Sequence, residues 1–243
     1  RMTTTINKEE IQKFSKLADE WWDVNGKFKP LHMFNPIRIE YITDKIKQHF
    51  KISGEKTNSL KGLTILDIGC GGGLISEPMS RLGGIVTGID ASEKNIKVAK
   101  IHSARNKLEI DYLNKSPEQL EIKEKFDVIL NLEIVEHVDN VSFYIKSCHS
   151  LLKKGGLMFT ATLNRSLMSY LKAIVGAEYI LRWLPIGTHD WNKFLKPEEL
   201  EKFLHNEKFY TKNIKGFQFN PIFNKWKKTN NLSVNYIICS SKN

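Results

Sequence analysis

Two carboxylates and an imidazole lie close together at Glu133, Glu136 and His137. If this segment begins a helical turn, side chains at positions i, i+3 and i+4 project from one face. That set suits a divalent cation such as Mg²⁺, with open positions for water and a substrate. It also suits a metal-free arrangement in which His137 is a general base and a glutamate orients its ring. In a third interpretation, the Glu-His pair only shapes a pocket.

A second chemical feature is the run 65–73, which reads Ile-Leu-Asp-Ile-Gly-Cys-Gly-Gly-Gly. Its glycines can adopt positive φ and approach a ligand closely, and the helix expected next offers free N–H groups. These properties are typical of a nucleotide-cofactor loop. The spacing argues against a dinucleotide, because the third glycine of G-x-G-x-x-G, counted from Gly69, falls on Leu74.

Alternating strands and helices must position these residues. Short apolar runs predict strands at 63–68, 85–89, 110–113, 126–132 and 157–163. Ser92 can cap a helix that runs to about Asn106, and a helix at 141–152 ends in a Lys-Lys-Gly-Gly stop. Pro78 indicates that the helix after the glycine loop starts late or is kinked. The pattern predicts an α/β fold with a parallel sheet and helices on both faces.

The ends of the chain depart from this repeat. Segments 210–220 and 233–240 resemble strands joined by a short polar segment, so they predict a hairpin. We expect residues 1–60 to form an N-terminal helical cap. Residues 61–243 would form the main domain, with a helical insertion at 165–204, in one structural domain overall. The non-core segments are expected to cover the substrate site.

Composition narrows the class of protein. The chain has 243 residues, 41% of them hydrophobic, which is enough for one sizeable core. Three cysteines make no disulfide framework and indicate a reducing, cytoplasmic compartment, and no apolar run reaches the ~18 residues of a membrane span. The net charge of +10 rests on lysine, since only six of the 37 basic residues are arginine. Readers of bases and phosphates favour arginine, so the charge is weak support for nucleic-acid binding.

The spacing Asp67-x-Gly69-x-Gly71-x-Gly73, with Asp90 ending the next strand, resembles motif I of class I S-adenosylmethionine-dependent methyltransferases. The resemblance implies a Rossmann-like fold with a seven-stranded, mostly parallel sheet and an antiparallel last strand at its edge. It also implies that the loop backs the methionine part of the cofactor and that Asp90 holds the ribose hydroxyls. A carboxylate suits a vicinal diol because it accepts two hydrogen bonds at once. The alternative is a tight turn followed by a helix-capping Asp.

A larger set of segments, spread from about residue 11 to 236, resembles the O-methyltransferase family of ubiquinone biosynthesis. The segments are Ala-Asp-Glu-Trp-Trp-Asp at 18–23, Phe-Lys-Pro-Leu-His at 28–32, Asn-Pro-Ile-Arg at 35–38, Thr-Leu-Asn-Arg at 162–165, Val-Gly-Ala-Glu-Tyr-Ile-Leu at 175–181, Gly-Thr-His-Asp at 187–190 and Val-Asn-Tyr at 234–236. That family methylates catechol-type hydroxyls of polyprenylated rings at two steps. The resemblance places cofactor contacts at Arg38, Gly69, Asp90 and Leu132. A guanidinium such as that of Arg38 can hold the cofactor's carboxylate with two hydrogen bonds.

The implied reaction explains the acidic cluster. Methyl transfer from a sulfonium needs a phenolate, and a free phenol with a pKa near ~10 is mostly protonated at neutral pH. A metal that chelates both catechol oxygens would lower that pKa and orient one oxygen. In the resembling family, the positions of Glu133, Glu136 and His137 are associated with metal binding.

A polyprenyl substrate stays in the bilayer, so the resemblance implies a peripheral enzyme on the cytoplasmic face of the inner membrane, alongside other ubiquinone-biosynthesis proteins. The amphipathic segment 166–184 could lie on that membrane or line a lipophilic tunnel, or pack on the core as an ordinary helix. The Lys-Trp-Lys-Lys run at 225–228 could be an interfacial anchor or a solvated hairpin turn.

Several assignments stay open. Trp21 and Trp22 are expected to pack the N-terminal helix over the cofactor, and His189 and Asp190 could border the substrate. The segment 114–118 follows the third strand, but its acid is displaced from the usual adenine position. A nucleic-acid methyltransferase is disfavoured, because Leu-Glu-Ile-Val-Glu replaces the Asn/Asp-Pro-Pro-aromatic element after the fourth strand. A non-catalytic subunit of a membrane-bound complex is the remaining alternative.

Overall fold

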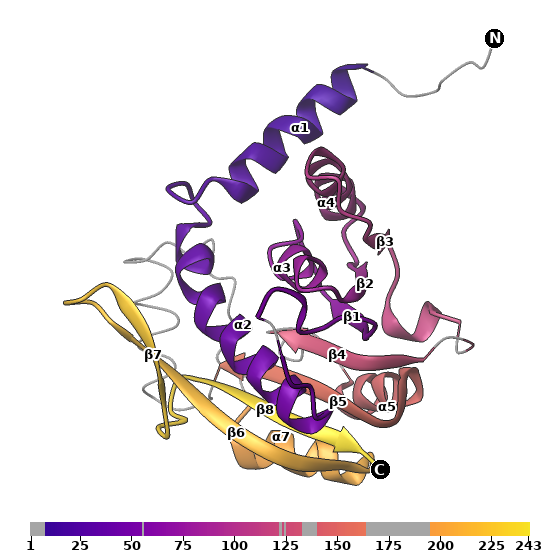
Figure 1. Ribbon diagram of the computed structural model, residues 1–243, viewed down its shortest axis with the longest axis vertical. Helices are drawn as coiled ribbons and strands as arrows, with labels where there is room; N and C mark the ends of the chain where they lie inside the picture. Colours follow the sequence, from indigo (N-terminus) through magenta and orange to yellow (C-terminus); the bar gives the residue numbers. More distant parts are fainter. Residues whose placement is uncertain (1–7, 55, 122, 124, 133–139, 164–194) are drawn as a thin grey trace.

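The computed structural model describes residues 8–54, 56–121, 123, 125–132, 140–163 and 195–243 (Figure 1). The predicted cluster at Glu133, Glu136 and His137 lies outside these residues, as do His189, Asp190 and segment 166–184.

In the described part of the chain, eight strands form one sheet in the order β3-β2-β1-β4-β5-β8-β6-β7. Its parallel part contains β3 (Asp111–Leu113), β2 (Ile85–Ile89), β1 (Thr64–Ile68), β4 (Phe126–Leu132) and β5 (Leu152–Leu163). The chain proceeds outward from β1 to β2 and β3 on one side, and from β4 to β5 on the other. The strand order therefore reverses between β1 and β4, where ligands of open α/β sheets bind at the carboxyl ends of the strands.

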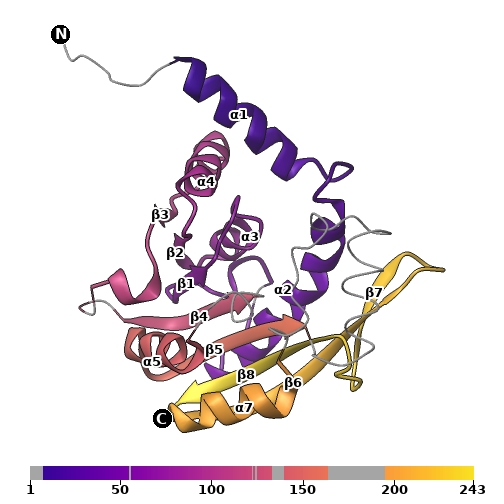
Figure 2. The same ribbon diagram turned by 180° about the vertical axis from the view of Figure 1, so that it is seen from behind.

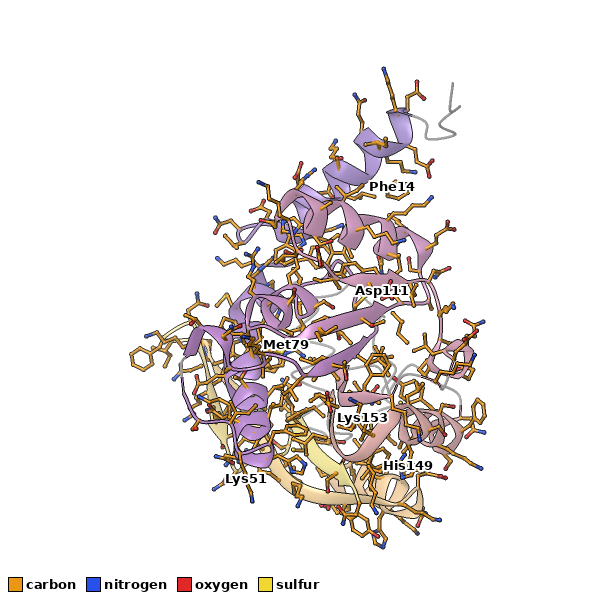
Figure 3. All side chains as sticks on the ribbon, turned by 45° about the vertical axis from the view of Figure 1, so that its right-hand side comes forward. Phe14, Lys51, Met79, Asp111, His149 and Lys153 are labelled. Carbon is orange, nitrogen blue, oxygen red and sulfur yellow. The ribbon has the colours of Figure 1, made fainter. Side chains whose placement is uncertain are left out.

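Two apolar layers bury the sheet. On one face, α2 (Lys29–His49) and α3 (Ser76–Arg81) pack on side chains such as Ile65 and Leu130, and Met79 is fully buried in this layer (Figure 3). On the other face, α5 (Val141–Leu151) and α7 (Pro197–Asn206) cover Leu66 and Ile129, as the reverse view shows (Figure 2). These layers confirm the predicted α/β fold with helices on both faces of the sheet.

Local sequence explains where the helices begin. The Ser92 side chain accepts a hydrogen bond from the Asn95 amide at 3.2 Å and caps α4 (Glu93–Arg105), as predicted. Pro78 lies in the first turn of the six-residue α3, where its missing N–H has no partner to lose. The helix after the glycine loop thus starts late, which is one of the two outcomes that Pro78 indicated.

Two helices precede the sheet. Helix α1 (Lys8–Trp22) lies beside α4, and α2 then crosses one face of the sheet (Figure 1). Lys97 of α4 holds α1 by an ion pair to Glu10 at 2.7 Å and lies 5.0 Å from the centre of the Phe14 ring, which is labelled in Figure 3. Arg105 forms a second ion pair, to Asp19 at 2.6 Å.

The C-terminal strands differ from expectation in two details. Strands β6 (Phe209–Asn220) and β8 (Asn235–Lys242) pair antiparallel as predicted. However, β8 lies between β5 and β6 rather than at the edge, and the predicted polar connection contains a further strand, β7 (Lys225–Thr229). The sheet of the described residues thus has eight strands instead of seven. The Lys-Trp-Lys-Lys run lies in the edge strand of the sheet, which pairs only with β6 in the described sheet. Its side chains alternate, so that Trp226 faces the core while Lys225 stays in water.

The helix predicted at 141–152 is confirmed as α5, but the expected role of the Lys-Lys-Gly-Gly run as its last turn and stop is wrong. Helix α5 ends at Leu151, and the strand begins at once, with Leu152 pairing Phe126. The register then jumps so that Val128 pairs Leu157, and Gly155 adopts a φ of +80°. The two lysines and two glycines therefore form an irregularity inside β5, where glycine permits the left-handed backbone.

Among the described residues, no helix combines the length and the apolar content that crossing a bilayer requires.

Candidate functional site

The glycine loop leaves the carboxyl end of β1, at the point where the strand order reverses. Gly71 and Gly73 adopt φ values of +54° and +92°, which favour glycine. A Cβ at Gly71 would lie 2.8 Å from the Trp21 ring, and one at Gly73 would lie 2.5 Å from the Tyr112 hydroxyl. The loop therefore has no side chain at Gly71 or Gly73, because any larger residue there would have a strained backbone and would collide with Trp21 or Tyr112.

Asp90 follows β2 and faces this loop. Its Oδ2 accepts a hydrogen bond from the Gly71 amide at 2.9 Å, and its Oδ1 accepts one from the Ser92 amide at 2.8 Å. The Asn95 side chain also donates to Oδ1, at 3.4 Å. A carboxylate oxygen has two lone pairs, so Oδ2 keeps acceptor capacity for a ligand hydroxyl, and a ligand could replace the long Asn95 contact at Oδ1. The Asn114 side chain donates to the Asp90 carbonyl at 2.9 Å, which brings the start of segment 114–118 beside this acid.

Asp67 and Arg38 are buried charges behind the loop, with exposed fractions of only 3% and 4%. Asp67 accepts a hydrogen bond from the Ser76 hydroxyl at 2.6 Å. Burial raises the Asp67 pKa to about 7, while Ser76 and the positive charge of Arg38 oppose that rise. On α2, Arg38 donates to Asn35 Oδ1 at 2.7 Å and lies 4.5 Å from the centre of the Phe34 ring.

Leu132 ends β4 on the same side of the sheet as Asp67. It is half-buried and packs on the core cluster that includes Phe34 and Leu130. The β1–β4 register pairs Ile68 with Asn131, so the end of β4 lies beside the end of β1, where the glycine loop begins. The buried Asn131 side chain accepts a hydrogen bond from the Tyr144 hydroxyl at 2.6 Å and joins this end of β4 to α5.

Helix α1 covers the loop through its two tryptophans. Trp21 lies over Gly71 and Gly72, and the Trp22 indole donates to the Gly72 carbonyl at 3.1 Å. The Trp22 ring stacks on His102 of α4, with 3.9 Å between ring centres and 2° between planes. The Nδ1 of His102 in turn lies 2.5 Å from the fully buried Glu77 carboxylate. This chain of contacts fixes the end of α1 against the loop.

Comparison with known proteins agrees with this geometry. A family model described as a methyltransferase domain matches residues 66–160. A ubiquinone biosynthesis O-methyltransferase of Pelagibacter ubique is 62% identical over 98% of this chain and 99% of its own length. One of Roseobacter denitrificans is 51% identical over 98% and 97% of the two chains.

The chain belongs to the ubiquinone biosynthesis O-methyltransferase family.

It is an S-adenosylmethionine-dependent methyltransferase. Among solved structures, magnesium protoporphyrin IX methyltransferase of Synechocystis with bound S-adenosylmethionine superposes with a TM-score of 0.61, covering 99% of this chain and 100% of that one. At 16% identity, this likeness shows the fold alone.

The residues near the loop fit the cofactor of this methyltransferase family. S-adenosylmethionine offers a carboxylate, an ammonium, a ribose diol and a sulfonium. The side chains near the loop are one buried cation, Arg38, one buried acid, Asp67, and one half-buried acid, Asp90. The roles of the individual residues, with Gly69 and Gly71 as backbone contacts and Leu132 as an apolar contact, stay predictions.

No three His, Cys, Asp or Glu side chains gather as a metal site among the residues that the structure describes. The predicted ligands Glu133, Glu136 and His137 fall between the end of β4 at Leu132 and the α5 cap at Asn140, outside that part.

Sequence reasoning missed four residues of this site. Asn35 stands three residues before Arg38, so helical spacing could have indicated that contact. Ser76, Glu77 and His102 carried no such signal. Their contacts depend on how the loop turns back over β1 and on how α3 and α4 pack, and neither follows from the spacing of residues along the chain.

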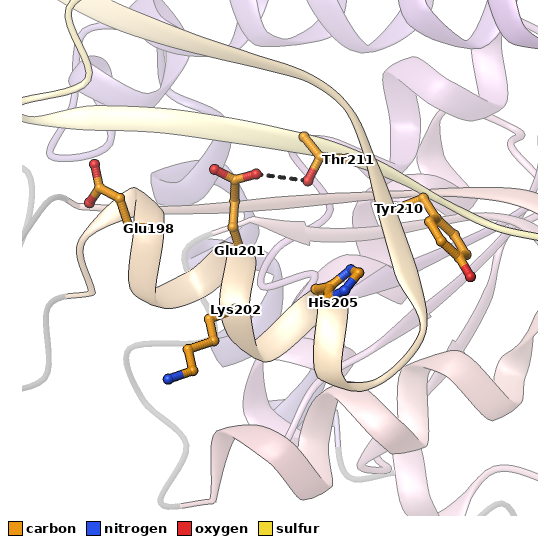
Figure 4. Close-up of a pocket in the computed structure, with 6 residues that line it drawn as sticks. All are labelled: Glu198, Glu201, Lys202, His205, Tyr210 and Thr211. Carbon is orange, nitrogen blue, oxygen red and sulfur yellow. Dashed lines mark hydrogen bonds between the residues drawn. The ribbon is translucent and has the colours of Figure 1, made fainter.

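A surface hollow elsewhere does not belong to this site. Its walls come from α7 and the start of β6, and Glu201 accepts a hydrogen bond from Thr211 across it at 3.0 Å (Figure 4). Strand β6 runs parallel to β5, because both pair antiparallel with β8. The start of β6 therefore lies at the amino edge of the sheet, opposite the glycine loop.

Proposed function

We propose that this chain methylates catechol-type hydroxyls of polyprenylated ubiquinone precursors, at both O-methylation steps of that pathway. The observation that carries the proposal is its 62% identity, over nearly the full length of both chains, to a protein named for this activity. The arrangement of Arg38, Asp67 and Asp90 around a bare-backbone loop supports it.

In this proposal, Arg38 pairs with the cofactor's carboxylate and Asp90 accepts hydrogen bonds from the ribose hydroxyls. The backbone at Gly69 and Gly71 lies against the methionine part, and Leu132 makes an apolar contact. S-adenosylmethionine supplies a methyl group on a positively charged sulfur. Trp21 and Trp22, which lie on the loop, exclude water from that side.

We further propose that Glu133, Glu136 and His137 bind Mg²⁺, which lowers the pKa of the substrate hydroxyl and holds its two oxygens. What supports this role is their place in the sequence, directly after Leu132, since β4 ends beside the strand β1 from which the glycine loop leaves. The alternative without metal makes His137 the general base that removes the phenolic proton.

Because a polyprenyl substrate stays in the bilayer, the enzyme is proposed to work in the cytoplasm on the cytoplasmic face of the inner membrane. Other proteins of ubiquinone biosynthesis are proposed partners, and nucleic acid is not.

The test is to incubate the protein with methyl-labelled S-adenosylmethionine and a short-tailed polyprenyl catechol, with Mg²⁺ or after exhaustive chelation, beside an RNA and DNA control. We expect label on the catechol oxygen. Label on nucleic acid alone, or on neither, contradicts the proposed substrate.

The metal proposal is tested in the same assay with Glu133→Gln, Glu136→Gln and His137→Asn. We expect chelation to abolish activity, and Mg²⁺ to restore it only in the unmodified protein. The exposed Glu109→Gln is a matched control that should respond as the unmodified protein does. Activity that survives chelation but not His137→Asn supports the general base instead.

A further inference from the structure

The turn between β6 and β7, residues 221–224, presents two large apolar side chains to water. Ile222 is 84% exposed and Phe223 is 70% exposed, the highest fractions for large apolar residues in the described part of the chain. Two adjacent side chains of this kind are unfavourable in water unless something covers them. We name residues 221–224 the hairpin tip.

The backbone of the hairpin tip is organised to hold these side chains outward. The Asn220 side chain accepts hydrogen bonds from the amides of Ile222 at 2.9 Å and Phe223 at 3.3 Å. Asn224 then closes the turn with a φ of +52°, a conformation that asparagine tolerates. Because the turn satisfies its own amides, its shape does not depend on packing by Ile222 or Phe223.

The base of the hairpin is fastened to the body of the molecule. Trp226 stacks on Phe34 of α2 with 4.1 Å between ring centres, and Lys228 forms an ion pair with Glu40 at 2.8 Å. The hairpin is therefore held on α2, the helix that also carries Arg38.

Positive charge lies beside the apolar tip. The register pairs Lys225 with Asn220 and Lys227 with Gln218, on the face opposite Trp226. Both lysines are exposed. An apolar pair flanked by lysines is complementary to the surface of an anionic bilayer, where each nearby lysine contributes to attraction and apolar side chains enter the interface.

The direction of β6 places the hairpin tip at the functional edge of the sheet. Since β6 is parallel to β5, its last residue, Asn220, lies on the side of the carboxyl ends, as the glycine loop does. Figure 1 shows the hairpin extending beyond the body of the protein on that side, and Figure 2 shows the same from behind. A membrane that meets the tip would thus face the edge where substrate enters.

We propose that the hairpin tip inserts Ile222 and Phe223 into the headgroup layer of an anionic bilayer, with Lys225 and Lys227 on its phosphates. This inference rests on the proposed function in one respect: the membrane contact would bring the enzyme to a substrate that stays in the bilayer. A second copy of the chain fits less well. Lysines on an edge strand repel the like-charged edge of another copy and block strand pairing.

The test is flotation with vesicles of phosphatidylglycerol and phosphatidylcholine, or of phosphatidylcholine alone. We expect the protein to float with the anionic vesicles. Replacing both apolar residues, Ile222→Ser with Phe223→Ser, should weaken partitioning at least about tenfold, and Lys225→Gln with Lys227→Gln should weaken it about thirtyfold. Matched controls are Phe143→Ser, a 54% exposed aromatic on α5, and Lys94→Gln with Lys100→Gln on α4; neither should change partitioning.

Insertion itself is measured by labelling Ile222→Cys with an environment-sensitive dye. The three native cysteines, Cys70, Cys148 and Cys239, are buried, so the label is selective. A blue shift on anionic vesicles at Ile222→Cys but not at Phe143→Cys supports the proposal. An unshifted dye, equal flotation of the tip variant, or dissociation of a dimer by that variant overturns it.

Methylation of a water-soluble catechol separates this inference from the proposed function. Tip variants that retain this activity but lose flotation support the inference. If every variant floats as the unmodified protein does while the soluble catechol is methylated, the inference fails and the function stands. If no catechol is methylated, the function fails whatever the flotation shows.

Discussion

The two acids beside the glycine loop differ in how much water reaches them. Asp90 is half-buried and accepts backbone hydrogen bonds from Gly71 and Ser92. Asp67 is almost fully buried, and its pKa is raised to about 7 by burial, against the opposing effect of Ser76 and Arg38. Without a ligand, Asp67 is therefore only partly ionised near neutral pH. A cationic group bound at the loop would favour its charged form.

The raised pKa of Asp67 predicts how stability depends on pH without cofactor. Because the folded pKa of about 7 lies above the ordinary value of 3.8, the contribution of Asp67 to stability is fully present below about pH 4 and is lost as pH rises through 7. Each pKa unit corresponds to about 1.4 kcal/mol. Asp67→Asn should remove this part of the pH dependence. Thermal melts of both proteins from about pH 4 to about pH 8 check this, and parallel curves would contradict it.

Asp90 predicts an effect on cofactor affinity. In its proposed role, Asp90 accepts hydrogen bonds from the ribose hydroxyls, so alanine would remove these acceptors, and a hydrogen bond to a charged group contributes about 1.5–3 kcal/mol. We expect Asp90→Ala to weaken S-adenosylmethionine binding by tenfold or more, measured by calorimetry. The exposed Asp111→Ala, at the start of β3, is the control and should bind normally. A comparable loss in both variants would show that charge alone, not the position of Asp90, matters.

At the scale of elements, α1 is held at both of its ends. Near its start, Lys97 of α4 contacts Glu10 and Phe14, and at its end Trp22 contacts His102 and the Gly72 carbonyl. Only the second contact reaches the cofactor loop. The end of α1 and the loop should therefore respond together to changes at Trp22.

Trp22→Ala should release the end of α1 from the loop. It removes a ring stack and a hydrogen bond, so we expect roughly tenfold weaker S-adenosylmethionine binding and faster hydrogen exchange at the α1 amides near Trp22. Phe14→Ala is the matched control, because it loosens α1 from α4 without touching the loop. Equal loss of cofactor affinity in both variants would mean that α1 acts as a whole and that Trp22 has no separate role.

How well the sequence predicts the structure differs from one element to the next. Strands β1, β2 and β4 are short, mainly apolar runs between turn or charge signals, and the pairing of the glycine loop with Asp90 identified the cofactor class. Strand β7 was not predicted, because only one of its side chains, Trp226, faces the core. In the sequence, a lysine-rich run with a single apolar residue looks like a polar turn, although it is typical of an edge strand. The irregular start of β5 was not predicted, because a glycine that follows a helical pattern, as Gly155 does, usually marks the end of an element.

The cover that α1 makes over the loop could be anticipated from Trp21 and Trp22, but its partners could not. Trp22 meets Gly72 and His102 at separations of 50 and 80 residues, and only the packed arrangement of α3 and α4 brings them there. Local spacing predicts elements, whereas contacts between elements depend on the whole packing.

At the scale of the molecule, the features proposed to act in function lie at the same edge of the sheet. The glycine loop, the end of β4 and the far end of β6 all lie at the carboxyl side of the parallel strands. The chain also carries a net charge of +10, mostly as lysine. A positively charged molecule is attracted to anionic surfaces at long range, and the hairpin tip then determines which edge makes contact.

This arrangement predicts a salt effect that depends on where the substrate is. Raising ionic strength from about 0.01 M to about 1 M shortens the Debye length from about 30 Å to about 3 Å and removes long-range attraction to the bilayer. Turnover of a long-tailed catechol in anionic vesicles, at limiting lipid, should then fall by roughly tenfold or more, since each lysine near the surface contributes about 1 kcal/mol.

Turnover of a water-soluble catechol is the control for this salt effect and should change little, because it needs no encounter with a surface. A long-tailed catechol in phosphatidylcholine vesicles should be turned over slowly at either salt concentration. Equal salt sensitivity with the soluble substrate would place the effect at the cofactor site, where Arg38 and Asp90 carry the charges, and not at the membrane.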